Sequence, residues 1–254
     1  MLTLWCIVVA VLLNLLLERI LVTALTRNPV GREWVRRTPL LHPNGISIMR
    51  IPMGLVAVGL AHQGWWEAGA LWFAFWMISD LSDGTIARNC DLVTESGKWL
   101  DPLSDKAMYF PGLIYCSLSQ SVRLPLPWGW VLAFLVIDAL GQGSRLVIQK
   151  KAANYFGKAK TAFVTILLTL TALHQIHELP FMSPGFVYAI MVSCTLLAFM
   201  SAYCKVIPDF WYANNLTLAN FVCGLAALWY ISIGQPLRAF VLVFIGQFFD
   251  LFDG

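Results

Sequence analysis

The stretch DLSDGTIARNCDLVTESGKWLDPLSDK, from Asp80 to Lys106, places six acidic residues in a chain that is otherwise mostly apolar. Hydrophobic residues make up 59% of the sequence, charged residues only 12%, and the mean hydropathy is +0.71. Such a composition is typical of membrane proteins with several spans and excludes an ordinary soluble domain. A membrane protein that gathers its carboxylates in one stretch needs a chemical reason to do so, because ionised groups near a bilayer are costly.

Apolar runs recur along the whole chain, and most approach the roughly 20 residues that a helix needs to cross the hydrocarbon core. We therefore predict an all-α fold, a polytopic transmembrane helical bundle. The runs are Leu2–Leu17, Ile46–Ala61, Glu67–Ile86, Trp99–Leu118, Trp128–Ile148, Thr161–Leu173, Phe181–Tyr203, Leu216–Ile233 and Leu237–Phe252.

The cations lie at alternate connections between these runs, whereas the other connections carry only Arg123. Short cytoplasmic loops are enriched in Lys and Arg, so the cation-rich side is predicted to be cytoplasmic, and the acidic stretch lies on that side. The cations are Arg27, Arg32, Arg36, Arg37, Arg88, Lys98, Lys150, Lys151, Lys158, Lys160 and Lys205.

The spacing of the acids favours a site built from two helices. Asp80 and Asp83 are three residues apart, and Gly97, Asp101 and Asp105 follow one another at intervals of four, so each set shares one helix face. Clustered carboxylates at a membrane face suggest a divalent cation site, and ligands that are all oxygen favour Mg²⁺ or Mn²⁺. Two such ions suit in-line attack at phosphorus. The alternative is a solvated, charged loop.

The same residues resemble the signature of the CDP-alcohol phosphotransferases, with every fixed position present. The signature reads Asp80-x2-Asp83-Gly84-x2-Ala87-Arg88-x8-Gly97-x3-Asp101-x3-Asp105. The resemblance implies an integral membrane enzyme with a six-helix core, which displaces CMP from a CDP-linked lipid with an alcohol, uses two divalent ions and works at the cytoplasmic face. It also implies CDP-diacylglycerol as the donor, contact with membrane lipids, and a homodimer.

The resemblance assigns roles position by position. Asp80, Asp83, Asp101 and Asp105 would hold the metals, and Asp105 would also be the catalytic base that takes the proton from the acceptor hydroxyl. The CDP moiety would lie against Asp80, Asp83, Gly84, Ala87, Arg88 and Gly97.

Within the family, the segment ESGKWLDPLSDK (Glu95–Lys106) looks most like phosphatidylglycerophosphate synthases and the related cardiolipin synthases. Asn44-x2-Ser47-x2-Arg50 resembles the family's first-helix entry motif, and Gly157-Lys158-x-Lys160-Thr161 resembles the basic loop of the glycerophosphate enzymes. Glycerol 3-phosphate is therefore the expected acceptor. Its phosphate would meet Arg145, Lys158 and Lys160, which offer charge-assisted donors; the alternative is that these cations only set the topology.

Asp138 lies in the middle of an apolar run, seven residues before Arg145, a spacing that the same subfamily shows. An acid at such a depth needs a partner, so it is either structurally paired or in contact with the acceptor.

The end of the chain repeats its middle. DLFDG at 250–254 echoes DLSDG at 80–84, and a shift of 170 residues also aligns Asn44 with Asn214 and Gly54 with Gly224. We expect three parts: an N-terminal membrane helix with a basic juxtamembrane segment (1–43), a CDP-alcohol phosphotransferase domain (44–206), and two helices of an incomplete second repeat (207–254).

Several other functions remain open. Cardiolipin, phosphatidylserine or phosphatidylinositol(-phosphate) synthesis would use the same chemistry with another acceptor. A divalent-cation transporter would need acids near the middle of the bilayer, where only Asp138 lies. A catalytically silent scaffold would be expected to lack an acid of the signature. Nucleic-acid binding is not indicated, because the cations are dispersed over loops between spans.

Overall fold

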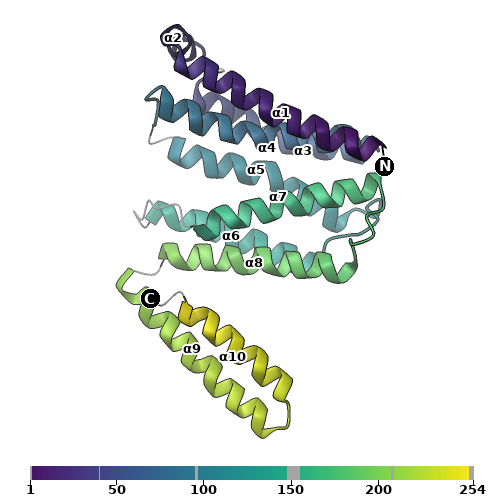
Figure 1. Cartoon of the computed structure of the whole chain (residues 1–254), viewed down its shortest axis with the longest axis vertical. Helices are drawn as coiled ribbons and strands as arrows, with labels where there is room; N and C mark the ends of the chain where they lie inside the picture. The colour runs from purple at the N-terminus through teal and green to yellow at the C-terminus, as the bar shows by residue number, and fades with distance from the viewer. Residues whose placement is uncertain (1, 40, 95–96, 148–154, 207–208, 252–254) are drawn as a thin grey trace. The chain divides into compact units, whose positions relative to one another are not determined.

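The computed structural model describes residues 2–39, 41–94, 97–147, 155–206 and 209–251. These ranges form ten helices and contain no strand (Figure 1). Each apolar run of the sequence coincides with one helix, and the arginine-rich segment adds the short helix α2, so the predicted all-α bundle is confirmed. The helices are α1 (Leu2–Arg27), α2 (Pro29–Arg37), α3 (Pro43–His62), α4 (Trp66–Asn89), α5 (Gly97–Leu118), α6 (Trp128–Val147), α7 (Tyr155–Ile176), α8 (Pro184–Val206), α9 (Asp209–Ser232) and α10 (Pro236–Leu251).

Five of the described segments are long and apolar enough to cross a membrane. Helices α4 and α5 are of comparable length, but charged side chains interrupt their apolar sequences. The five segments are Cys6–Arg27, Pro43–His62, Tyr155–Ile176, Pro184–Lys205 and Asn214–Ser232.

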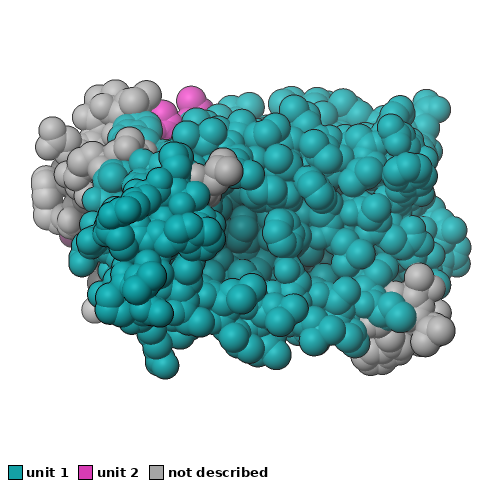
Figure 2. All heavy atoms as spheres, turned by 90° about the horizontal axis from the view of Figure 1, so that it is seen from above, with its two compact units in different colours: residues 1–139, 155–198 teal, residues 140–154, 199–254 magenta. Residues whose placement is uncertain are grey.

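The chain divides into two compact units, which Figure 2 colours separately. Unit 1 comprises Met1–Ala139 and Tyr155–Ala198, and it holds α1 to α5, α7 and most of α6 and α8. Unit 2 comprises Leu140–Asn154 and Phe199–Gly254, and it includes the hairpin of α9 and α10.

Unit 1 is held together by an apolar core to which all of α3 to α8 contribute. Met108 and Leu113 of α5, Phe134 of α6, Val164 of α7 and Met191 of α8 are all fully buried in it. Since lipid tails are as apolar as these side chains, close packing between helices is what holds such a core together in a membrane.

Helices α3 and α5 approach closely at Gly54. A Cβ atom there would lie 2.6 Å from the carbonyl oxygen of Met108 and 2.8 Å from its Cα, so a glycine is needed. The carbonyl of Ala107 faces the same spot. That carbonyl has no helical donor four residues on, because residue 111 is proline and lacks an N–H. With no side chain at Gly54, the backbones of α3 and α5 therefore pack directly against each other at this position.

Helix α2 is fastened beside the end of α4. Its one fully buried side chain, Val35, packs with Ile86 and Cys90, and the Nη2 of Arg36 donates to the Cys90 carbonyl at 3.1 Å. Trp34 on the same helix is 56% exposed, as expected for an aromatic residue at a membrane interface.

Candidate active site

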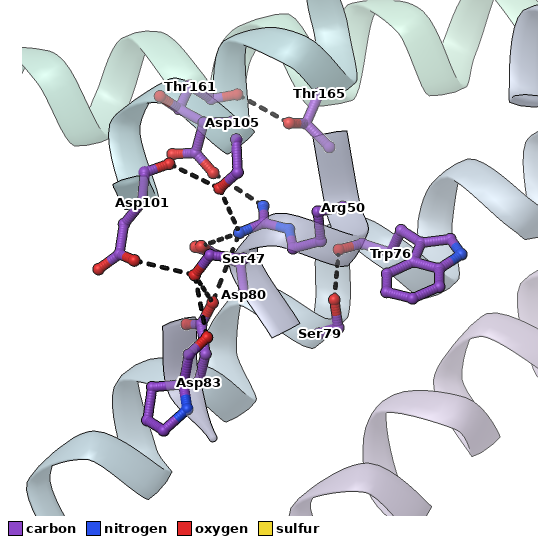
Figure 3. A network of polar contacts seen from close by, with 12 residues as sticks. Ser47, Arg50, Trp76, Ser79, Asp80, Asp83, Asp101, Asp105, Thr161 and Thr165 are labelled. Atoms are coloured by element: carbon purple, nitrogen blue, oxygen red, sulfur yellow. Dashed lines mark hydrogen bonds and ion pairs between the residues drawn. The ribbon is translucent and has the colours of Figure 1, made fainter. Parts of the chain in front are cut away.

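Three acids of the signature, from two helices, contact the side chain of Arg50 on a third helix, and the fourth acid, Asp101, contacts Ser47 on that third helix (Figure 3). Asp80 and Asp83 lie near the end of α4, and Asp101 and Asp105 lie in the first turns of α5. The predicted sharing of helix faces explains this geometry, because each helix turns both of its acids toward α3.

Arg50 is the central charge of the cluster, and its side chain is fully buried. Its Nη1 lies 2.5 Å from the Oδ1 of Asp80 and 3.7 Å from the Oδ2 of Asp83, and its Nη2 lies 2.8 Å from the Oδ1 of Asp105. The planar guanidinium can serve several carboxylates at once, because its five N–H groups point outward in fixed directions.

Ser47, one turn before Arg50, connects Asp83 with Asp101, the fourth acid. Its Oγ lies 3.1 Å from the Oδ2 of Asp83 and 3.0 Å from the Oδ1 of Asp101. A hydroxyl donates one hydrogen, so Ser47 can serve only one of these carboxylates at a time.

The cluster therefore has an excess of negative charge. Four carboxylates face one guanidinium, which leaves three negative charges when all five groups are ionised. The donor atoms are oxygens, the ligands that Mg²⁺ and Mn²⁺ prefer, so both the charge and the chemistry of the cluster suit divalent cations. Within the described residues, no three acid, His or Cys side chains already stand together in a metal-binding arrangement. Arg50 occupies the space between the acids instead.

The other residues of the signature line the same end of the two helices. Gly97 is buried, and a Cβ atom on it would lie 2.9 Å from the Oδ1 of Asn44 and 3.1 Å from the Oγ1 of Thr94, so a larger residue would collide with both side chains. The surroundings of Gly84 are open: among the described residues, only the Nη2 of Arg88 lies within 4 Å of such a Cβ, at 3.9 Å.

The half-buried Ala87 and the exposed Arg88 lie within one turn of Gly84 on α4. This part of the cluster thus combines free space with an unburied guanidinium.

Asp138 is paired with side chains of other helices, which is the first of the two alternatives that the sequence left open for it. The carboxylate is buried, it accepts a 2.6 Å hydrogen bond from the Oη of Tyr109, it is ion-paired with Lys160, and the Nζ of Lys106 lies 3.4 Å away. A buried carboxylate with two ammonium partners is stable where a single unpaired acid would not be.

The three cations expected to bind the acceptor phosphate differ in their surroundings. Lys160 is buried against Asp138, whereas Lys158, two residues earlier on α7, is exposed. Arg145 falls within α6, but its side chain lies outside what the structure describes.

Replacing Lys160 by methionine is expected to lower the free energy of unfolding by about 3 kcal/mol, because the variant removes the direct counter-charge of the buried Asp138. Lys158→Met on the same helix is the matched control and should leave the unfolding transition almost unchanged. Denaturant titration of both variants in detergent measures the difference. Equal stability of the two variants would contradict a structural role for the pair.

Sequence reasoning assigned none of four side chains of these networks to the site, although it identified Ser47 and Arg50 as part of an entry motif: Ser47, Arg50, Lys106 and Tyr109. The signal for the first two was present, because a serine and an arginine three residues apart interrupt an apolar run directly after Asn44. Nothing in the sequence pairs Lys106 and Tyr109 with an acid on another helix.

Known proteins resemble this chain over much of its length. Residues 40–201 match the family described as CDP-alcohol phosphatidyltransferase. The chain is 33% identical over 145 residues to the "CDP-diacylglycerol--glycerol-3-phosphate 3-phosphatidyltransferase" of Bacillus subtilis, which covers 55% of this chain and 69% of that protein. It is 28% identical over 175 residues to the Rickettsia felis protein of the same name, covering 67% of this chain and 92% of that protein.

A "Putative cardiolipin synthase" of Mycobacterium tuberculosis is 34% identical over 139 residues, or 50% of this chain and 64% of that protein. The chain thus spans somewhat less than two thirds of that relative. No solved structure matches the chain significantly.

Proposed function

Because the chain belongs to the CDP-alcohol phosphatidyltransferase family of phospholipid biosynthesis, we propose that it transfers a phosphatidyl group from CDP-diacylglycerol to glycerol 3-phosphate and releases CMP. The observation that carries the proposal is the gathering of the four acids around Arg50 and Ser47 of α3. The acceptor rests on the names of relatives such as the Bacillus subtilis protein.

Asp80, Asp83, Asp101 and Asp105 would together hold two divalent ions, Mg²⁺ or Mn²⁺. Such ions, when bound, neutralise the diphosphate and stabilise the charge that develops on the entering and leaving oxygens. This role fits the excess negative charge of the cluster, which the single guanidinium of Arg50 does not balance.

Asp105 is the proposed general base. Its Oδ1 is held by Arg50, so its Oδ2 is the atom left to accept the proton of the acceptor hydroxyl. The acceptor oxygen then forms a bond to the phosphorus that carries the diacylglycerol, and the bond from that phosphorus to CMP breaks. CMP leaves with the bridging oxygen, and the proton stays on Asp105 until solvent removes it.

The nucleotide is proposed to lie along the end of α4, where Gly84 and Ala87 leave room and Arg88 offers a charge-assisted donor to a phosphate oxygen. Gly97 shapes the opposite side, because Asn44 fills the space where its side chain would be. The distribution of cations along the sequence supports a site at the cytoplasmic face. A homodimer is proposed on the family resemblance alone.

For the acceptor phosphate we propose Lys158, Lys160 and Arg145. Lys158 is exposed and needs no rearrangement to reach an anion, whereas Lys160 would have to share its ammonium between Asp138 and the phosphate.

The experiment that tests the acceptor measures CMP release from CDP-diacylglycerol with glycerol 3-phosphate, serine, inositol and phosphatidylglycerol, each added separately. Stimulation by phosphatidylglycerol instead of glycerol 3-phosphate would favour cardiolipin synthesis, the function that the mycobacterial relative is named for.

Removal of divalent cations is expected to abolish CMP release. EDTA followed by dialysis should lower the rate by at least about 10²-fold, because the uncompensated acids would repel the diphosphate. Mn²⁺ or Mg²⁺ should restore the rate, and Ca²⁺, which accepts looser geometry, should restore less of it. An undiminished rate in EDTA would remove the metals from the proposal.

A further inference from the structure

The hairpin of α9 and α10 has the same internal construction as the hairpin of α3 and α4. Helix α3 ends at His62 and α9 at Ser232, and α4 begins at Trp66 and α10 at Pro236, so both boundaries are 170 residues apart. This is the offset that aligns the two stretches of sequence.

The two turns also match in their backbones. Gly64 and Gly234 both have a left-handed conformation, with φ of 87° and 74°. The N–H of Gly64 donates to the carbonyl of Ala61 at 3.0 Å, and the N–H of Gly234 donates to that of Ile231 at 3.0 Å.

The pairing of polar side chains is repeated with one change. Where Arg50 pairs with Asp80 in the first hairpin, the Nδ2 of Asn220 lies 3.3 Å from the Oδ1 of Asp250 in the second. The second hairpin thus keeps the contact between its two helices at this position but has no cation there.

The two hairpins differ in what covers them. Gly54 and Ala61 on α3 are buried, and at Gly54 the covering element is the backbone of α5. Within unit 2, the corresponding face of α9 is uncovered: among the described residues of that unit, nothing lies within 4 Å of a Cβ atom built on Gly224, and Leu228 and Ile231 are 65% and 59% exposed.

We propose that this face of α9, which consists of Gly224, Leu228 and Ile231, is the docking surface for a transmembrane helix of the α5 kind. Such a helix carries two carboxylates four residues apart and, two residues after the second one, a backbone carbonyl whose helical N–H donor is missing because the residue four positions on is proline. In α5 these positions are Asp101, Asp105, Ala107 and Pro111. Docked on Gly224, it brings its carboxylates to the level of Asn220 and Asp250, and the second hairpin becomes part of a second acidic cluster.

Lipid alone does not account for this face. A glycine within a lipid-exposed helix costs about 0.5–1 kcal/mol relative to alanine, and small residues in transmembrane helices are typical of helix contacts. The polar pair of Asn220 and Asp250 also favours a helix contact over lipid, because polar groups in a membrane protein mostly face other helices or water.

The experiment uses the full chain in lipid nanodiscs and a synthetic peptide with the sequence of α5, Gly97–Leu118, in which photo-methionine replaces Met108. After irradiation, mass spectrometry locates the cross-links. The proposal predicts cross-links to α9 at or beside Gly224. In the variant Gly224→Leu, whose side chain would occupy the docking position, their yield should fall by about tenfold.

Val222→Leu is the matched control, because Val222 is 55% exposed at the same depth and points to roughly the opposite side of α9. It should leave the yield unchanged. Leu228→Trp enlarges the docking face without touching the glycine and should lower the yield as well, so the test survives if Gly224→Leu fails to fold. Equal labelling by a scrambled peptide, or equal yields in all three variants, would overturn the proposal and leave the face to lipid.

Discussion

Asp105→Asn is expected to lower the rate of CMP release by about 10²–10⁴-fold while leaving the protein folded. The amide keeps the shape of the carboxylate, and its oxygen can still accept the hydrogen bond from the Nη2 of Arg50. It cannot take up the proton of the acceptor hydroxyl, so the loss should appear in kcat. The measurement is CMP release at saturating CDP-diacylglycerol and glycerol 3-phosphate, with circular dichroism to monitor folding.

The control for this variant is Asp91→Asn. Asp91 is an exposed acid outside the cluster, and its φ of 56° is a conformation that asparagine also tolerates. The control should keep the full rate. A rate near that of the unmodified protein in Asp105→Asn would rule out Asp105 as the base.

Arg50→Met is expected to have the largest effect on stability. Methionine has an unbranched side chain that fills part of the buried volume, but it leaves Asp80, Asp83 and Asp105 without their shared counter-charge. Breaking a buried ion pair costs about 3–5 kcal/mol, and the free energy of unfolding should fall by that amount in metal-free detergent solution. Mn²⁺ should raise the unfolding midpoint of this variant more than that of the unmodified protein, because the ion would then supply the missing positive charge.

Arg123→Met provides the comparison. Arg123 also pairs with an acid, Glu178, but the two side chains are 46% and 80% exposed, and such surface pairs contribute roughly 0–1 kcal/mol. A loss of stability in Arg50→Met no larger than in Arg123→Met would show that the cluster does not depend on Arg50.

The helices could be predicted from the sequence because each span had to be apolar over most of its length. The polar ends of the helices were harder to predict. Helix α7 begins at Tyr155 and not at Thr161, since Lys160 is buried within the helix by its pairing with Asp138. Helix α2 was not among the predicted apolar runs, because arginines dominate its sequence. A single apolar residue, Val35, makes its buried contact with the end of α4.

For the site, the spacing of the acids correctly indicated which side chains share a helix face. The spacing of the acids could not show that Arg50 lies between them, because that position depends on how α3 packs against two other helices. The same holds for Lys160: its sequence context resembles a phosphate-binding loop, yet the partner that the structure provides is the carboxylate of Asp138.

The contact at Gly54 has a consequence for the evolution of the chain. Gly54 lies one turn after Arg50, and its backbone partner Met108 lies three residues after Asp105. The contact at Gly54 and the ion pair between Arg50 and Asp105 therefore both depend on the same position of α3 along α5. An inserted residue between Gly54 and Arg50 would rotate the arginine by about 100° around α3 and carry it away from the acids. Among homologous sequences, we therefore expect length differences in the connections between helices, and none within 47–54 or 101–108.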